Sequence, residues 1–292
     1  MDIEERIISE VPLDKGWSND KKSIVTTPDG RFVRRIIDDA RISSTTTLFF
    51  HIGSLNLDDN PFSRPMELDC APPPARLYTT YVEGEDLEEA LGTLSQKEQI
   101  RLGYEAGFAL KKIHTRVRVK DDGMWANKYN AKIDRKIKAY QECGIKVPGD
   151  QLLIDRIDSL RIYLEGRPQT FQHGDYHVGN FVLTPDRHLG ILDFDRWDIG
   201  DPWEEFNRIV WCADLCPVFA SARIDAYFNF QVPESFFPLL FLYQAVNALA
   251  SLPWAIPYGE KEVEVMLKNA RRFKEDTEDF ANIVPRWYEK TR

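Results

Sequence analysis

Two stretches of sequence decide the fold, QHGDYHVGN at residues 172–180 and ILDFD at residues 191–195. We expect Asp175 to lie in a tight loop between two strands, where neighbouring glycines permit backbone angles that other residues avoid. Asn180 begins the second of these strands, and Asp193 ends the strand that pairs with it. The pattern therefore predicts that these three side chains meet in one cleft.

The chemistry of these three residues indicates phosphoryl transfer. Asn180 and Asp193 offer two oxygen ligands, and a Mg²⁺ ion held by so few protein groups takes its other ligands from water and phosphate. Asp175 is then free to accept a proton from a hydroxyl nucleophile. Phosphoryl transfer requires this combination of positioning and charge neutralisation.

The first part of the chain is rich in strand and turn signals. A β-branched run at 23–27, a Pro-Asp-Gly turn at 28–30 and a second apolar run at 31–37 predict a β-hairpin. The elements expected after it are a helix over 42–57, a proline-punctuated loop over 61–74 and a strand over 77–82.

The apolar spacing becomes helical after residue 95. Ser95 and Glu98 match a capping box, and apolar residues then recur at three- and four-residue intervals as far as His114. The remainder, including the charged final segment, is expected to be helical apart from its prolines. The elements expected in between are helices over 128–143 and 152–164, and strands over 170–173, 180–183 and 189–194.

These signals predict an α+β protein with two lobes. The N-terminal lobe is small, rich in β-structure and spans residues 1–82, and the C-terminal lobe is larger, mainly helical and spans residues 83–292. A single hinge strand near residues 78–84 is expected to connect them. No internal repeat is visible.

One uncharged stretch, residues 235–259, is long enough to cross a bilayer. Prolines at 238, 253 and 257 restrict its longest helix to about residues 239–251, which is too short to span. We therefore expect a buried core helix and no membrane partner.

The motifs resemble those of the protein-kinase-like small-molecule kinases, in particular the aminoglycoside phosphotransferase and choline kinase family. That family carries His-Gly-Asp, four variable positions and Asn, then Ile/Leu-Asp-Phe/Trp, then Gly-Asp-Pro. Here these motifs fall at residues 173–175, Asn180, 192–194 and 200–202. The resemblance implies a bilobal kinase fold and Mg²⁺-dependent transfer of a phosphate from ATP or GTP to a small-molecule hydroxyl. It makes Asp175 the base and Asn180 and Asp193 the metal ligands.

The resemblance also implies that the N-terminal lobe binds the nucleotide. The family places a phosphate-facing loop before a strand, a Lys or Arg on the next strand, and backbone groups for the base edge on the strand between the lobes. For each position, the alternative is an ordinary turn or strand residue. The matching residues here are Ser18, Asn19, Arg35, Thr80, Tyr81 and Val82.

Four further residues match positions that support the site in this family. His173 and His177 are expected to hold the catalytic loop by hydrogen bonds. Asp201 belongs to a structural turn and is also placed to cap a helix that starts at Pro202. Glu205 matches an acid that supports the catalytic loop. Asp201 and Glu205 belong to an acidic segment that follows Asp193. The alternative function of this segment is an acidic surface that binds a polycationic ligand.

The N-terminal lobe departs from the kinase pattern in one respect. Kinases orient the phosphate-binding cation with a glutamate from the following helix. Residues 36–66 of this chain contain no glutamate. Either an aspartate replaces the glutamate, or other groups orient the cation, or the sequence of this lobe has diverged from the kinase pattern. A non-catalytic nucleotide-binding pseudokinase is therefore an alternative function.

Two other readings of the catalytic segment compete with this one. The period-two spacing of His173, Asp175 and His177 would suit a zinc hydrolase if the segment were a strand. A protein kinase would carry Arg-Asp in place of Gly174-Asp175 and an activation segment before Gly200. The downstream Asn and Asp favour the small-molecule kinase over both.

The net charge and the cysteine content limit the classes of binding partner and the cellular compartment that we expect. The net charge of −9 at pH 7 argues against a nucleic-acid partner, which requires a basic face, and suits a neutral or cationic small molecule. Four scattered cysteines and an N-terminus without a signal-peptide pattern indicate the cytoplasm. With the family resemblance, the acidic balance suggests an aminoglycoside-type amino sugar as acceptor, hence antibiotic resistance. The alternatives are choline, homoserine, a sugar or a macrolide.

Overall fold

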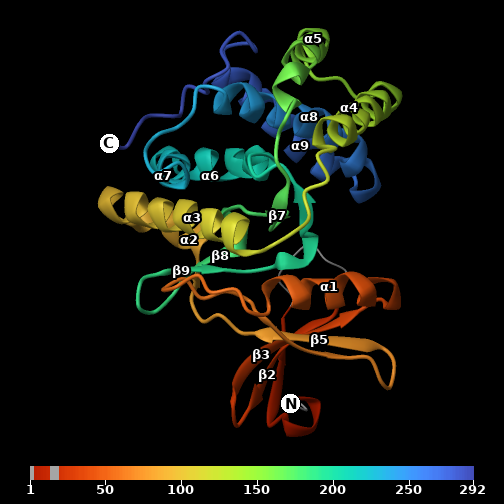
Figure 1. The fold of residues 1–292 in the computed structure, drawn as a ribbon, viewed down its shortest axis with the longest axis vertical. Helices are drawn as coiled ribbons and strands as arrows, with labels where there is room; N and C mark the ends of the chain where they lie inside the picture. The colour runs from red at the N-terminus through yellow and green to blue at the C-terminus, as the bar shows by residue number, and fades with distance from the viewer. Residues whose placement is uncertain (1–2, 14–19) are drawn as a thin grey trace.

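The computed structural model describes residues 3–13 and 20–292, which form a small β-rich lobe and a larger helical lobe (Figure 1). The small lobe is built on a five-stranded antiparallel sheet in the order β1-β2-β3-β5-β4. Its strands are β1 (Ser9–Pro12), β2 (Lys22–Thr27), β3 (Gly30–Ile37), β4 (Pro65–Asp69) and β5 (Ala75–Thr80).

The predicted hairpin is confirmed as β2 and β3, in which Ile24 lies opposite Val33. The expected loop over 61–74 was wrong in part, because it contains strand β4. A proline begins this strand, and β4 lies at the edge of the sheet, where a missing N–H donor costs no ladder hydrogen bond.

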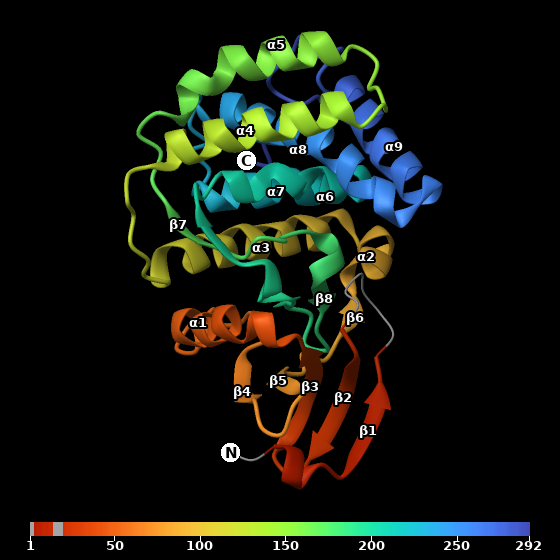
Figure 2. The same ribbon diagram turned by 90° about the vertical axis from the view of Figure 1, so that its right-hand side faces the viewer.

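Helix α1 (Ile42–Ile52) lies between the sheet and the large lobe (Figure 2). It is shorter than the predicted 42–57, since its last turn ends at Gly53. Its weak helix formers are accommodated by hydroxyls that donate back into the helix, such as Thr46 to the carbonyl of Ile42 at 2.9 Å.

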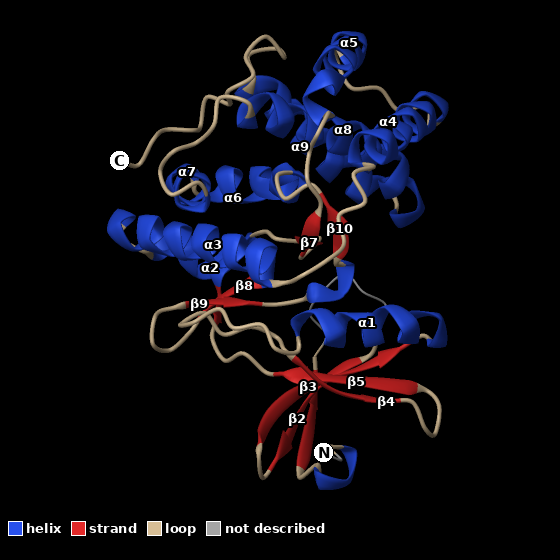
Figure 3. Cartoon of the chain, in the orientation of Figure 1, coloured by secondary structure: helices blue, strands red, loops and turns tan. Residues whose placement is uncertain are grey.

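The large lobe is mainly helical (Figure 3). The predicted helices near 95–114, 128–143 and 152–164 are confirmed, and the first begins with the expected capping box at Ser95. The helices are α2 (Leu87–Ala90), α3 (Gln96–Arg116), α4 (Trp125–Glu142), α5 (Asp150–Leu160), α6 (Ile209–Leu215), α7 (Pro217–Tyr227), α8 (Phe236–Ala255) and α9 (Glu260–Asp276).

Helix α8 is longer than the predicted 239–251. Pro238 lies in its first turn, where backbone N–H groups have no partner within the helix, and Pro253 falls in its last turn. The segment Phe236–Tyr258 is long and apolar enough to cross a membrane by length and composition, but 61% of its most apolar window is buried inside the lobe. It is the core helix that the sequence predicted.

The expectation of helix to the end of the chain was wrong beyond Asp276. The final segment instead lies along α7 as turns and loop, with Asp225 accepting hydrogen bonds from the Tyr288 hydroxyl at 2.7 Å and the Thr291 amide at 2.7 Å. Three consecutive residues after α9, Glu278, Asp279 and Phe280, have positive φ, which an α-helix does not admit.

Two small sheets carry the segments that surround Asp175. One is β6-β8-β9, formed by β6 (Glu85–Asp86), β8 (Phe181–Leu183) and β9 (Leu189–Ile191). The other pairs β7 (Thr170–Gln172) with β10 (Asp198–Gly200). The expected strands near 170–173, 180–183 and 189–194 are therefore present.

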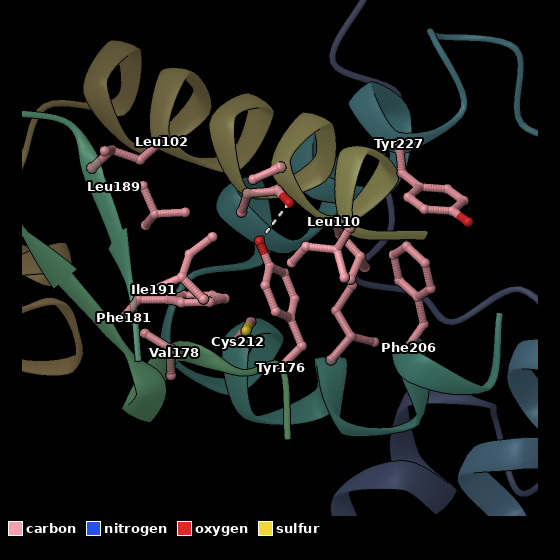
Figure 4. Packing of buried hydrophobic residues seen from close by; sticks show 14 of the residues in the cluster. Leu102, Leu110, Tyr176, Val178, Phe181, Leu189, Ile191, Phe206, Cys212 and Tyr227 are labelled. Carbon is pink, nitrogen blue, oxygen red and sulfur yellow. Dashed lines mark hydrogen bonds between the residues drawn. The ribbon is translucent and has the colours of Figure 1, made fainter. Parts of the chain in front are cut away.

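The core of the large lobe packs directly behind these sheets (Figure 4). Tyr176 is fully buried, and its hydroxyl donates to the carbonyl of Ala106 in α3 at 2.8 Å. Cys212 and Cys216 are both buried in this cluster. The loop that carries Asp175 is thereby anchored to α3.

Candidate functional site

The backbone of the loop after β7 is held by two buried side chains. The Glu205 carboxylate accepts hydrogen bonds from the amides of His173 at 2.6 Å and Gly174 at 2.9 Å. The fully buried His173 ring donates through Nε2 to the carbonyl of Leu192 at 2.8 Å. Gly174 has φ of 82°, and a Cβ there would collide with the carbonyl of Arg196. Any other residue at this position would strain the backbone and clash with Arg196, so the loop requires glycine here.

Asp175 lies among three basic side chains. Its carboxylate is 2.8 Å from Nη1 of Arg208, 3.3 Å from Nε2 of His177 and 3.7 Å from Nε of Arg196. Burial by itself would raise the pKa of Asp175, but the His177 hydrogen bond and the charge of Arg208 outweigh it, and the net pKa lies well below the usual value. Asp175 is therefore ionised and able to accept a proton.

Asn180 and Asp193 lie on neighbouring segments. The amide of Leu192 donates to the carbonyl of Asn180 at 2.9 Å, which places Asp193 beside Asn180. The side-chain Nδ2 of Asn180 donates to the carbonyl of Asp175 at 2.8 Å. This bond directs the Asn180 Oδ1 away from the loop backbone, so the three predicted residues are brought together.

The donor chemistry of this pair fits Mg²⁺. Asp193 adopts a left-handed backbone conformation with φ of 61°, its amide is held by the Ser63 hydroxyl at 3.0 Å, and its carboxylate is 33% exposed. One carboxylate and one amide oxygen match a cation that keeps water and phosphate ligands.

Arg35 reaches this site from the other lobe. It lies on β3, is 9% exposed, and places Nη2 at 3.6 Å from the Asp193 carboxylate and Nε at 3.8 Å from Asp20. It also forms an ion pair with Asp195. Its neighbour Arg34 points to the opposite face, where it binds Glu4 at 3.1 Å.

Two aspartates outside α1 lie beside Arg35. Asp20 precedes β2, and Asp195 follows β9. Arg41 bridges these two carboxylates, at 2.6 Å from Asp20 and 3.0 Å from Asp195. Sequence reasoning left Asp195 without a role, although its position two residues after Asp193 was a usable signal.

The residues expected at the base edge lie beside a groove of about 600 Å³. Thr80 donates its amide to the carbonyl of Arg64 at 2.8 Å, and the amide of Tyr81 donates to Arg31 at 3.1 Å. Val82 is buried, and its side chain approaches Gly190 of β9. Ser18 and Asn19 lie outside the described residues.

Asp201 is fully buried at the base of the helical lobe. It pairs with the Arg167 guanidinium through both oxygens, at 2.6 and 2.8 Å, and accepts the Tyr243 hydroxyl at 2.6 Å. It also accepts the amide of Trp203 at 2.8 Å, as a capping residue does. Its contacts are those of a structural turn.

The geometry does not support the zinc alternative. His173 directs Nε2 to a backbone carbonyl, while His177 accepts the Gly179 amide through Nδ1 and faces Asp175 with Nε2. Across residues 3–13 and 20–292, no group of three or more His, Cys, Asp and Glu side chains is placed to hold a metal ion.

Two basic residues at the site were missed by the sequence analysis. Arg208 precedes α6, and Arg196 follows the Asp193 segment. Neither carries a local sequence signal, because each reaches Asp175 only through the packing of α6 and of the β9–β10 connection against the loop.

Known phosphotransferases resemble this chain in sequence pattern and in fold. A family model described as the phosphotransferase enzyme family matches residues 9–238, and no curated protein matches the chain. The structure is similar to aminoglycoside phosphotransferase APH(4)-Ia in complex with ADP and hygromycin B, with a TM-score of 0.68, 12% identity and coverage of 94% of this chain and 96% of that chain.

Two further solved structures share the fold. ADP-bound APH(2'')-Ib gives a TM-score of 0.62 at 15% identity, covering 93% of this chain and 96% of that one. The gentamicin complex of APH(2'')-IIa gives a TM-score of 0.61 at 15% identity, covering 91% of this chain and 92% of that one. Their fold is the protein-kinase-like bilobal fold expected from the sequence. The chain belongs to the phosphotransferase enzyme family, a family of small-molecule kinases.

Proposed function

We propose that this protein transfers the γ-phosphate of ATP or GTP to a hydroxyl group of a small molecule in a Mg²⁺-dependent reaction. The observation that carries the proposal is the hydrogen-bonded chain that joins Asp175 to Asn180 and Asn180 to the segment of Asp193. A carboxylate close to two oxygen ligands is the arrangement that phosphoryl transfer uses, and this chain of contacts supports it.

Each residue has a defined task in this proposal. Asp175 accepts the proton of the acceptor hydroxyl, a step worth roughly 10²–10⁴ in rate. Asn180 and Asp193 would hold Mg²⁺, which neutralises phosphate charge when bound. Arg35 would bind the phosphates from the side of the small lobe. Glu205 keeps the loop in place by accepting two of its amides.

We also propose a division of the chain between the two co-substrates. Residues 1–82 would form the nucleotide-binding lobe, with Ser18 and Asn19 near the phosphates and residues 80–82 near the base. Residues 83–292 would form the catalytic and acceptor lobe, and residues 78–84 the hinge. The ADP complexes of similarly folded phosphotransferases support a nucleotide co-substrate.

The first candidate for the acceptor is an aminoglycoside-type amino sugar, which would make the protein a cytoplasmic resistance enzyme. The complexes of similarly folded enzymes with hygromycin B and gentamicin support this class. Choline, homoserine, sugars and macrolides are the alternative acceptors.

A nucleotide-consumption assay with two aspartate variants tests the proposal. Asp193→Ala should abolish Mg²⁺-dependent consumption of ATP or GTP, and Asp175→Asn should lower transfer to an acceptor about 10²- to 10⁴-fold. Asp198→Ala, an exposed aspartate nearby, is the matched control and should keep full activity. If Asp193→Ala consumes nucleotide as fast as the parent, the metal assignment is wrong. Nucleotide binding without turnover in the parent would identify a pseudokinase.

A further inference from the structure

Lys22 lies on the face of the small-lobe sheet that points toward Asp193. Strands β2 and β3 run side by side (Figure 2), and Lys22 lies opposite Arg35 in their antiparallel register. Residues opposite each other in such a pair have their side chains on the same face of the sheet. Arg35 contacts Asp193 of the large lobe from this face. Arg34, one position away, contacts Glu4 on the other face.

The two guanidinium groups on this face are already paired with carboxylates. Arg35 lies 3.6 Å from Asp193 and 3.8 Å from Asp20, and it also forms an ion pair with Asp195. Arg41 lies 2.6 Å from Asp20 and 3.0 Å from Asp195. These five side chains carry two positive and three negative charges, a sum of −1. A phosphate can reach either guanidinium only by displacing a carboxylate.

Lys22 is a cation that no carboxylate holds in this way. Within residues 3–13 and 20–292, its half-buried side chain forms no ion pair. Burial and the charge of Arg35 lower the pKa of Lys22, while the charges of Asp193 and Asp20 oppose this effect. These influences agree with an ammonium group that faces the same cluster. A phosphate can therefore bind Lys22 without breaking an ion pair.

The charge of a triphosphate makes this free ammonium group important. The phosphates would meet a cluster that is already negative, and like charges at close range cost binding energy. The Lys22 charge brings the sum of the cluster from −1 to zero. An ammonium group on a flexible stem has three donors that can turn toward phosphate oxygens.

We propose that Lys22 is a phosphate-binding residue of the nucleotide site. The proposal rests on the proposed kinase function and adds a residue that the sequence analysis did not predict. Arg35 would bind a phosphate by exchange with one of its carboxylates, whereas Lys22 offers a positive charge that is not yet paired. Lys22 therefore contributes to the affinity for the phosphates and not to the affinity for the base or the ribose.

Equilibrium binding of nucleotides and nucleosides tests this proposal. ATP and GTP are titrated with Mg²⁺ into the parent and into Lys22→Met, and adenosine and guanosine are titrated in parallel. Lys22→Met removes the charge at similar length, so the Kd of the triphosphate that binds the parent should rise about tenfold. The Kd of the matching nucleoside, which has no phosphate, should not change. Lys22→Arg, which keeps the charge, should stay closer to the parent.

Two comparisons separate a binding role from a structural one. Lys21→Met removes a charge at the adjacent, exposed position and should change neither Kd. The urea midpoint of Lys22→Met should equal that of the parent, because no ion pair is lost. Lys22→Gln repeats the experiment with a polar side chain, in case methionine disturbs the start of β2.

The outcomes distinguish this proposal from the kinase proposal. An unchanged triphosphate Kd in both Lys22→Met and Lys22→Gln would overturn the role of Lys22. An equal loss of affinity for the triphosphate and its nucleoside would overturn it too, since the substitution would then act on the fold. In either case the kinase proposal stands if the parent binds the triphosphate and consumes it in an Asp193-dependent reaction. If the parent binds neither ATP nor GTP, both proposals fail.

Discussion

At the scale of single residues, Glu205 shows how a buried charge holds the loop that carries Asp175. It is 4% exposed and lies 3.7 Å from Nε2 of His114. Burial by itself would raise the pKa of Glu205, but the nearby His114 and His173 rings and the Gly174 amide lower it below 4.5. The carboxylate is therefore ionised in the folded protein, although water is excluded from it.

Glu205→Gln should destabilise the protein by about 1–3 kcal/mol at pH 7, because two loop amides lose a charged acceptor. The pKa of Glu205 is lower in the folded state than in the unfolded chain, so its stabilising effect is full above pH 4.5 and is lost as the pH falls through the folded-state value. Urea unfolding at pH 7 and at pH 4 measures this difference.

The exposed Glu165→Gln is the matched control for this experiment and should leave the free energy of unfolding unchanged. A difference between Glu205→Gln and the parent that grows as the pH is lowered would contradict the assignment. Activity should fall together with stability, since the same amides position Asp175.

Sequence reasoning predicted the site residues that belong to one contiguous motif. Asp175 and Asn180 are close in sequence, and Asp193 follows the strand that pairs next to them, so local turn and strand chemistry was sufficient. Arg41 and Asp195 are 154 positions apart and were not predicted as a pair. Their contact depends on how the two lobes pack, which periodicity and spacing do not encode.

At the scale of elements, the close packing of α3 on α7 depends on the absence of a side chain at Gly103 and at Gly107. A Cβ on Gly107 would lie 2.8 Å from the Tyr227 amide nitrogen and 2.9 Å from the Cβ of Ala226, and closer still to the carbonyl of Arg223. Two of these atoms belong to backbone that cannot move without displacing α7. Close packing of the two helices therefore requires glycine here.

Gly107→Ala should lower the free energy of unfolding by about 1–3 kcal/mol, because the helices must separate to admit the methyl group. Gly92→Ala is the matched control, since a Cβ at Gly92 meets no atom within 4 Å and its backbone is not left-handed. Thermal or urea unfolding of both variants measures the effect. Equal stability of the two variants would show that α3 and α7 do not pack this closely.

The start of α3 gives a second prediction at this scale. Ser95 accepts the Glu98 amide, and the Glu98 carboxylate accepts the Ser95 amide in return. Ser95→Ala should cost about 0.5–2 kcal/mol of stability in urea unfolding. Ser159→Ala, whose hydroxyl only donates back into its own helix, serves as the control. A loss no larger than that of the control would argue against the cap.

The prediction of helices and strands succeeded where the spacing of apolar residues and the capping residues agreed. It failed where prolines were taken to end regular secondary structure. The capping box located α3, and β-branched runs located β2 and β3. Pro65 and Pro238 were both taken to prevent regular structure, yet each occupies a first-turn or edge position that needs no N–H donor. Only the tertiary position of a proline distinguishes these cases.

At the scale of the whole molecule, ion pairs connect the lobes across the site. Arg35 and Arg41 belong to the small lobe, and both bind Asp195, which follows β9 of the large lobe. The Asp195 side chain is 19% exposed, so the contact is partly shielded from water. These pairs hold the two lobes in a fixed relation around Asp193.

Asp195→Asn should weaken this connection by about 1–3 kcal/mol, because two partly buried guanidinium groups lose a charged acceptor. The free energy of unfolding should fall, and small-angle scattering should show a larger radius of gyration in the absence of nucleotide. Asp198→Asn, exposed and nearby, is the control. If the two variants have the same radius and stability, Asp195 does not join the lobes.

The partners of Arg35 also bear on how a triphosphate would enter. Carboxylates already neutralise this guanidinium, so an incoming phosphate would exchange with one anion rather than capture a bare cation. The displaced carboxylate would remain in the site with its charge, so Mg²⁺ and the neighbouring guanidinium groups would have to offset the negative charge that the phosphates add. Without a nucleotide, Arg35 therefore keeps the carboxylates of Asp193 and Asp195 as its counter-ions.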